Sequence, residues 1–335
     1  MSTQPAISIL LTSKFPTVAS ELLTNAGFTI TSWEEERPMT STELLEQAAS
    51  HNALLCTLTD SIDSQFLNQC SHLDIISQFA VGYDNIDVTE ATKLGIPIGF
   101  TPNAMNDATA DIAFGLMIAT ARKMFYSHKT IITGDWGFFK PTANLGIELK
   151  GKTLGIYGLG RIGLEMARRC KGAYQMKVIY HNRRHNQMAE QELNANKVSF
   201  GELLARSDVL SVHCSLTDET RGIFNKSVFD QMKQNSIFIN TSRGSVHNEK
   251  DLIAALDAGQ IWGAGLDVTN PEPMKPDNPL LSMANVSILP HIGSATVEAR
   301  DEMARLAAEN IIEFYKHNAV PFIVNAEVLV EKGTS

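Results

Sequence analysis

Short apolar runs alternate with helix-like segments along almost the whole chain, and this alternation restricts the fold more than any other feature. In the amino-terminal part the apolar runs are 7–12, 28–33, 53–58, 74–79 and 97–101. Helix-like segments such as 17–27 and 41–50 separate them, and we expect Ser41 or Thr42 to be the N-cap of the second. Strands that alternate with helices in this way pair in parallel and are covered by helices on both faces.

The alternation resumes after a long apolar segment at 107–123, which we interpret as a helix connecting two bodies. The later apolar runs are 152–158, 176–181, 209–214, 236–241, 263–268 and 286–289. Residues 295–317 then have the apolar stripe of a long amphipathic helix, and the last run, 319–325, is expected to return to the first body. A chain of 335 residues fits two domains of ~100–200 residues each.

The charge and the cysteine spacing of the chain argue against nucleic acid, anionic lipid and metal ions as partners. The chain has 28 Lys+Arg against 37 Asp+Glu, a net charge of −9, which disfavours binding to nucleic acid or to anionic lipid. The four cysteines have no metal-ligand spacing and are expected to be reduced thiols, which fits a cytoplasmic protein: Cys56, Cys70, Cys170 and Cys214. We also expect neither a signal peptide nor a membrane span, because no apolar stretch reaches ~18–20 residues.

The sequence GLGRIG at 158–163 matches the pattern G-x-G-x-x-G. The pattern alone is weak, but here an apolar strand precedes it and a helix-like segment follows it. The first glycine allows a tight turn, the second lets backbone approach a pyrophosphate, and the third lets the helix pack on the sheet. The alternative is a strand–helix turn with incidental glycines. We predict a dinucleotide site bound by Gly158, Gly160, Arg161, Ile162 and Gly163.

The end of the next strand indicates which dinucleotide is preferred. NAD sites place Asp or Glu there, whereas this strand ends at His181 and Asn182. Arg183 and Arg184 follow, and two guanidinium groups beside a neutral residue suit a 2′-phosphate. We therefore predict NADP as the preferred cofactor, with NAD possible if the arginines are only a solvated basic loop. His181 and His185 lack further ligands, so no metal site is predicted.

Three complementary side chains follow three later strands, at the edge of the sheet where ligands bind. Arg243 comes just past the run 236–241, Glu272 lies in the turn after Asp267, and His291 ends the run 286–289. Reduction of a 2-oxo acid requires a cation for the carboxylate, a proton donor for the carbonyl oxygen and a hydride donor. Arg243 is suited to bind the carboxylate, His291 to act as acid and base, and Glu272 to orient His291. The alternative is a surface ion pair beside a loop-capping histidine.

The chain resembles the D-isomer-specific 2-hydroxyacid dehydrogenases over nearly its whole length. The matching motifs are AVGYDNID (80–87), GLGRIG (158–163), FINTSRG (238–244), GLDVTNPEP (265–273) and LPHIGSAT (289–296). In that family the arginine, glutamate and histidine of the last three motifs are catalytic, which implies these roles for Arg243, Glu272 and His291. The resemblance implies an α/β fold in which a Rossmann-type parallel-sheet nucleotide domain (102–291) is inserted into a smaller flavodoxin-like α/β substrate domain (1–101 and 292–335).

The resemblance also implies further contacts. The backbone N–H groups of Val81 and Gly82 would bind the substrate carboxylate, together with Arg243 and His291, and Ser294 would contact the substrate. Thr109 would approach the cofactor phosphates, and Thr241, Asp267 and Gly293 would lie near the nicotinamide carboxamide. Together with the phosphate loop, the implied cofactor contacts are Thr109, Asn182, Arg183, Arg184, Ser215, Thr241, Asp267 and Gly293.

Within the family the chain looks most like the glyoxylate/hydroxypyruvate reductases, which implies a small 2-oxo acid substrate and a homodimer. In those relatives an aromatic residue of the loop after the connecting helix reaches the partner's site. The corresponding loop here is GDWGFFKP, with Trp136 and Phe139; ordinary interface packing of Trp136 is an equal alternative. Two other functions stay open: an NAD-dependent dehydrogenase of a larger D-2-hydroxy acid, and a nucleotide-sensing binding protein similar to the C-terminal-binding-protein corepressors.

Overall fold

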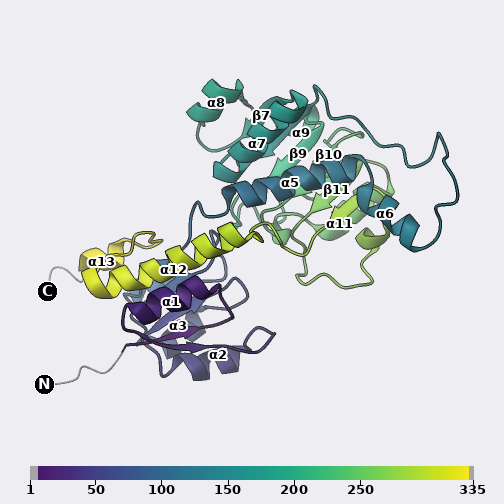
Figure 1. Cartoon of the computed structure of the whole chain (residues 1–335). Helices are drawn as coiled ribbons and strands as arrows, with labels where there is room; N and C mark the ends of the chain where they lie inside the picture. The colour runs from purple at the N-terminus through teal and green to yellow at the C-terminus, as the bar shows by residue number, and fades with distance from the viewer. Residues whose placement is uncertain (1–6, 332–335) are drawn as a thin grey trace, which may run out of the picture. The chain divides into compact units, whose positions relative to one another are not determined.

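The computed structural model describes residues 7–331, and these divide into two compact units, each built around one parallel sheet (Figure 1). The first unit comprises the residues up to Met105 together with those from Ala295 onward, and the second comprises Asn106–Ser294. Two α/β units with the second inserted into the first confirm the predicted fold class.

The first unit has a five-stranded sheet in the order β2-β1-β3-β4-β5, which is the flavodoxin-like order. All its pairings are parallel. Its strands are β1 (Ser8–Leu11), β2 (Thr29–Ser32), β3 (Ala53–Cys56), β4 (Ile75–Gln78) and β5 (Ile98–Gly99). Its helices are α1 (Thr17–Asn25), α2 (Ser41–Ala48), α3 (Ser64–Gln69), α4 (Val88–Lys93), α12 (Val297–His317) and α13 (Glu327–Glu331).

Alternate side chains of these strands enter two separate cores. Ile9 and Leu55 pack with α1 and α12 on one face, whereas Leu10 and Leu54 pack with α2 and α3 on the other. Figure 1 shows α12 lying beside α1, so helices from the two ends of the chain cover the same face. Successive side chains of each strand point to opposite faces of the sheet, and both faces are covered by apolar packing.

Two details of this unit differ from or extend the sequence predictions. The N-cap of α2 is Thr40, not Ser41 or Thr42, because Glu43 then occupies the third helical position and closes a capping box. The final apolar run does return to this unit: Phe100 N donates to Phe322 O at 3.0 Å, and Val324 N donates to Ile98 O at 2.8 Å.

The second unit has a seven-stranded parallel sheet in the order β12-β11-β10-β9-β6-β7-β8. The chain order reverses between β6 and β9, which is the switch point of a Rossmann-type sheet. Its strands are β6 (Thr153–Tyr157), β7 (Lys177–His181), β8 (Asn196–Lys197), β9 (Val209–Val212), β10 (Ile237–Asn240), β11 (Gly263–Leu266) and β12 (Val286–Ile288). The two-residue strand β8 was not predicted, because it has no apolar run.

Helices cover both faces of this sheet as well. The helices α5 and α7 lie side by side over one face, and α9, α10 and α11 pack on the other (Figure 1). Their bounds, with those of α6 and α8, are α5 (Asn106–Ala121), α6 (Met124–Ile132), α7 (Arg161–Tyr174), α8 (Gln187–Leu193), α9 (Phe200–Arg206), α10 (Lys226–Phe229) and α11 (Glu249–Asp257). The segment 107–123, expected to connect two bodies, thus packs as α5 within the second unit. No helix among residues 7–331 is long and apolar enough to span a membrane.

Candidate active site

The carboxyl ends of β6, β7, β9, β10, β11 and β12 meet at one edge of the second sheet, because all these strands are parallel. Each strand delivers a predicted site residue to that edge. The phosphate loop follows β6, Arg243 follows β10, Asp267 follows β11, and His291 follows β12. The sheet topology therefore brings these groups together from positions far apart in the sequence.

The phosphate loop has the shape that a dinucleotide requires. Gly158 has a φ of +91°, and a Cβ there would lie 2.7 Å from the backbone nitrogen of Cys214, so only glycine fits. A Cβ at Gly160 would point into open space, where a pyrophosphate can approach the backbone. The helix α7 begins at Arg161, and Gly160 has no side chain to cap it. The first N–H groups of α7 are thus suited to hold phosphate oxygens.

The loop after β7 carries the two arginines proposed for a 2′-phosphate, and both Arg183 and Arg184 are exposed. The side chain of Asn182 is engaged with the phosphate loop, since its amide exchanges two hydrogen bonds with the backbone of Leu159. No group of three or more His, Cys, Asp or Glu residues suited to a metal ion occurs in the described part of the chain.

The structure brings Arg243, Glu272 and His291 together. Glu272 Oε1 and His291 Nδ1 form a short hydrogen bond. Burial opposes the charge on Glu272, but the hydrogen bond and charge of His291, the Thr269 N–H and the charge of Arg243 outweigh it, so the pKa of Glu272 lies below its ordinary value. Glu272 is therefore ionised at neutral pH beside the imidazole and the guanidinium.

The backbone at Arg243 is fixed by a buried polar network that sequence reasoning missed. The Asn240 side chain donates to Arg243 O at 2.9 Å and accepts from Ser242 N at 2.9 Å. Burial lowers the pKa of His247 to about 4, so its imidazole is neutral at neutral pH. Asn240 Nδ2 lies 3.1 Å from His247 Nδ1 and can only donate, so Nδ1 is the unprotonated nitrogen that accepts. The only signal in the sequence was a polar residue ending the apolar run IFIN.

Gly244 lets the Arg243 turn approach the turn that carries Glu272. A Cβ at Gly244 would lie 1.8 Å from the backbone oxygen of Thr269, so no other residue fits without moving one of the two turns. Thr269 N in turn donates to Glu272 Oε2 at 3.4 Å. The close backbone approach is thus part of what places the arginine near the glutamate.

His291 has a left-handed backbone conformation, with a φ of +52°, which is uncommon for a residue other than glycine. Asp267 holds this conformation with three hydrogen bonds. Its backbone oxygen accepts from His291 N at 2.8 Å, and its carboxylate accepts from Ile292 N at 2.8 Å and from Gly293 N at 2.7 Å. Asp267 is only 1% exposed, and burial raises the pKa of its carboxyl group.

The other residues implied by the family resemblance lie near the same edge of the second unit or close to it in sequence. Thr109, on α5, is buried and donates to Gly293 O at 3.1 Å. Thr241 is buried at the end of β10, and its hydroxyl lies 3.4 Å from His213 Nδ1. Ser215 is exposed after β9, and Ser294 is half-buried directly after Gly293.

Val81 and Gly82 lie in the first unit, in the loop after β4. The Gln78 side chain, at the end of β4, donates to Gly82 O at 3.4 Å and to Asn85 Oδ1 at 2.8 Å. Asn85 donates in turn to Thr57 O at 3.1 Å, in the loop after β3. The backbone at Gly82 is therefore contacted by the Gln78 side chain at the carboxyl edge of its own sheet, a role that the sequence analysis did not assign.

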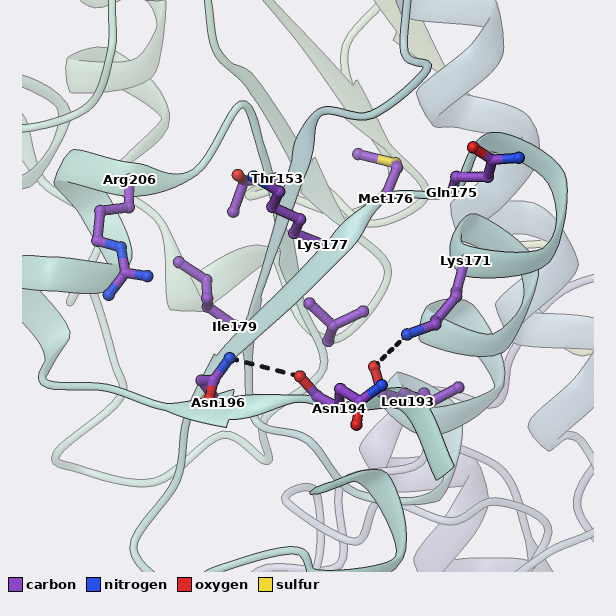
Figure 2. Close-up of a pocket in the computed structure, with 11 residues that line it drawn as sticks. Thr153, Lys171, Gln175, Met176, Lys177, Ile179, Leu193, Asn194, Asn196 and Arg206 are labelled. Atoms are coloured by element: carbon purple, nitrogen blue, oxygen red, sulfur yellow. Dashed lines mark hydrogen bonds between the residues drawn. The ribbon is translucent and has the colours of Figure 1, made fainter. Parts of the chain in front are cut away.

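A hollow of about 320 Å³ opens at the opposite edge of the second sheet, where β6 and β7 begin (Figure 2). Three cations line it: Lys171, Lys177 and Arg206. Figure 2 shows Lys171 donating to Leu193 O, the last carbonyl of α8, at 2.5 Å. The carboxyl ends of α7, α8 and α9 meet this edge, and cations stabilise such helix ends. Helix capping therefore accounts for Lys171 in this hollow, which lies at the sheet edge opposite the one that carries the site residues.

The chain has relatives among known proteins over most of its length. The model of the NAD binding domain of the D-isomer specific 2-hydroxyacid dehydrogenases matches residues 114–293. The glyoxylate reductase of Thermococcus litoralis is 45% identical over 301 residues, which are 89% of this chain and 90% of that protein. The Homo sapiens glyoxylate reductase/hydroxypyruvate reductase is 38% identical over 317 residues, 94% of this chain and 97% of that protein.

The fold also has close structural relatives. The crystal structure of an NADPH-dependent glyoxylate/hydroxypyruvate reductase from Sinorhizobium meliloti, in complex with NADP and malonate, superposes with a TM-score of 0.83. The two chains are 30% identical, and the match covers 95% of this chain and 96% of the other.

Replacing Asp267 with asparagine should loosen the segment that holds His291. An amide offers one acceptor and one donor group, so one of the N–H groups of Ile292 and Gly293 would face a second donor. We expect Asp267→Asn to lower the free energy of unfolding by about 1–3 kcal/mol in urea titrations. Amide hydrogen exchange at Ile292 and Gly293 should accelerate.

Asp230→Asn is the matched control, because Asp230 pairs with Lys226 on the surface of α10. That variant should change the free energy of unfolding by less than about 0.5 kcal/mol. Unchanged exchange at Ile292 and Gly293 in Asp267→Asn would contradict the role given to this carboxylate.

Proposed function

Because this chain belongs to the D-isomer-specific 2-hydroxyacid dehydrogenases, we propose that it reduces a short 2-oxo acid, glyoxylate or hydroxypyruvate, to the corresponding 2-hydroxy acid, of D configuration where the product is chiral. NADPH is the proposed preferred hydride donor. The observation that carries the proposal is the hydrogen-bonded Glu272–His291 pair beside Arg243, at the sheet edge that also carries the phosphate loop. The names of the relatives at 38–45% identity support the substrate class.

Arg243 binds the substrate in this proposal. Its guanidinium is always charged and has a planar set of donors that matches a carboxylate. The same donors polarise the adjacent carbonyl group, which lowers the barrier to hydride addition. The backbone N–H groups of Val81 and Gly82 are the second proposed partners of the carboxylate. Ser294 remains a proposed substrate contact.

His291 supplies the proton. Its Nδ1 is bonded to Glu272, which leaves Nε2 to donate to the carbonyl oxygen as that oxygen gains negative charge. A reduced nicotinamide bound at this edge would supply the hydride to the carbonyl carbon. After the transfer, the neutral imidazole keeps its proton on Nδ1 against Glu272. The side chain of His291 is 32% exposed, so Nε2 can regain a proton from water for the next cycle.

NADP is proposed as the preferred cofactor because β7 ends without the carboxylate of NAD sites, and the exposed Arg183 and Arg184 follow directly. A 2′-phosphate would form charge-assisted hydrogen bonds with them. The NADP complex of the Sinorhizobium meliloti relative supports this preference. NAD would bind the same phosphate loop without using the arginines. Within the second unit, the other proposed cofactor contacts are Thr109, Ser215, Thr241, Asp267 and Gly293.

We also propose a homodimer formed through the second unit. The helix α6 has no buried residue, although it contains Met124, Phe125, Ile131 and Ile132. The loop that follows exposes more large apolar side chains: Trp136, Phe138, Phe139 and Leu145. We call these eight residues the apolar arm. An exposed apolar surface of this size is typical of an interface, and the homodimers implied by the family resemblance identify a second copy of the chain as its partner.

Replacing His291 with alanine should remove the acid and base of the reaction. We expect kcat for glyoxylate or hydroxypyruvate to fall by at least ~100-fold, with the Kd for NADPH changed less than about twofold. Absorbance at 340 nm and calorimetric titration measure the two quantities. His317→Ala, at the exposed end of α12, is the control and should keep full activity.

Full turnover by His291→Ala would exclude this mechanism. Tight NADPH binding by the wild-type protein, without turnover of any 2-oxo acid in a panel, would instead favour the nucleotide-sensing alternative. High turnover of only the larger members of the panel would favour the dehydrogenase of a larger D-2-hydroxy acid.

Replacing both Arg183 and Arg184 with alanine should weaken the binding of NADPH but not that of NADH. Loss of the charge-assisted bonds to a 2′-phosphate should raise the Kd for NADPH about 10- to 100-fold and leave the Kd for NADH nearly unchanged. Arg206→Ala, at the opposite edge of the sheet, controls for loss of a positive charge. If the Kd values for NADPH and NADH change by the same factor, the arginines form a solvated basic loop and do not bind the 2′-phosphate.

Aspartate on the apolar arm should separate the dimer. We expect Ile132→Asp and Phe139→Asp, at positions 72% and 84% exposed, to convert a particle of twice the chain mass into a monomer in analytical ultracentrifugation. Met188→Asp is the matched control, since Met188 is an exposed apolar residue of α8 outside the arm. A wild-type protein that is monomeric at micromolar concentration would refute the proposal.

A further inference from the structure

The side chain of Asn182 forms a two-point hydrogen bond with the backbone of the phosphate loop. Leu159 N donates to Asn182 Oδ1 at 2.6 Å, and Asn182 Nδ2 donates to Leu159 O at 2.9 Å. The orientation of the amide is unambiguous, because a backbone N–H can only donate and a carbonyl can only accept. We call this pair of hydrogen bonds the Asn182 brace.

The brace lies where the parallel ladder between β6 and β7 ends. The last paired residues are Tyr157 and His181, and Gly158 N still donates to His181 O at 3.1 Å. At Gly158 the backbone turns away into the loop. The Asn182 side chain then supplies the donor and acceptor that a neighbouring strand would have supplied to Leu159. The backbone N–H and carbonyl of Leu159 thus both have partners although Leu159 lies beyond the strand.

A second asparagine reaches the same carbonyl. Asn186 Nδ2 donates to Leu159 O at 3.0 Å, and Asn186 Oδ1 caps α8 by accepting from Ala189 N at 3.1 Å. Arg183 and Arg184 lie between the two asparagines. The exposed loop with the arginines is therefore connected at both ends to one residue of the phosphate loop.

Leu159 is fixed from both sides, and the phosphate-binding amides follow it directly. Its side chain is buried in the core beneath α7, and its backbone is held by the brace. The N–H groups at the start of α7 belong to Arg161, Ile162 and Gly163, only two to four residues further on. A shift at Leu159 would move these donors, and charge-assisted hydrogen bonds to phosphate depend strongly on their direction.

We propose that Asn182 is a positioning residue: it orients the phosphate loop through Leu159 rather than selecting the cofactor by contact with the ribose. The inference rests on the proposed function only for the use of a dinucleotide. Asn186 still connects the arginine loop to Leu159 when Asn182 is replaced. Since NADPH and NADH have the same pyrophosphate, loss of the brace weakens the binding of both by the same factor. A direct contact of Asn182 with the ribose, where the two cofactors differ, would change their affinity ratio instead.

The test measures cofactor binding without turnover. In Asn182→Ala we expect the Kd values of NADPH and NADH both to rise about tenfold, with their ratio within about twofold of the wild-type ratio. Hydrogen exchange at the Leu159 amide should accelerate in the cofactor-free protein, because its acceptor is lost. Arg183→Ala is the comparison variant, in which the ratio should change and exchange at Leu159 should not.

Two results would overturn the proposal: a ratio changed more than about fivefold in Asn182→Ala with Leu159 exchange unaltered, or unchanged Kd values for both cofactors. Asn182→Ser provides the same comparison if the alanine variant does not fold. Asn196→Ala, at the exposed position of β8, controls for the loss of an asparagine from the same sheet. A wild-type preference for NADH would contradict the proposed NADPH selectivity. The prediction that Asn182→Ala raises both Kd values by the same factor would still stand.

Discussion

The candidate site depends most on one buried carboxylate, that of Asp267. It follows β11 and accepts hydrogen bonds from the two consecutive backbone N–H groups of Ile292 and Gly293, beyond the neighbouring strand β12. Without these acceptors the left-handed conformation of His291 would lack support, and the imidazole would lose its fixed position against Glu272. Burial makes the charge on Asp267 costly, so its two N–H donors compensate for the water that the fold removes.

The parallel sheet explains why so few residues are needed to build the candidate site. Each strand of the second unit ends at the same edge, so one polar side chain or turn per strand builds a site from segments more than a hundred residues apart. Close packing between the turns then requires glycine where backbones meet, at Gly158 against Cys214 and at Gly244 against Thr269. These glycines allow the close backbone approaches that place the phosphate loop and Arg243.

Elements with strong periodic patterns, and the site residues at strand ends, could be predicted from the sequence. Apolar runs predicted every strand except β8, whose two residues, Asn196 and Lys197, have no hydrophobic signature. The convergence of Arg243, Glu272 and His291 followed from the rule that parallel strands end together. Hydrogen bonds between distant residues could not be predicted, since nothing local indicates that Asn182 bonds to Leu159 or that Asn240 supports Arg243.

The first unit is assembled from both ends of the chain, and this determines the order in which the protein can fold on the ribosome. One face of its sheet is covered by α12, whose Met303, Ala307 and Ile311 are synthesised after the whole second unit. The nucleotide-binding unit can therefore complete its core first, because domains fold as units during synthesis. The amino-terminal strands are translated before the second unit, yet one of their apolar faces is covered by α1 alone until α12 has been synthesised.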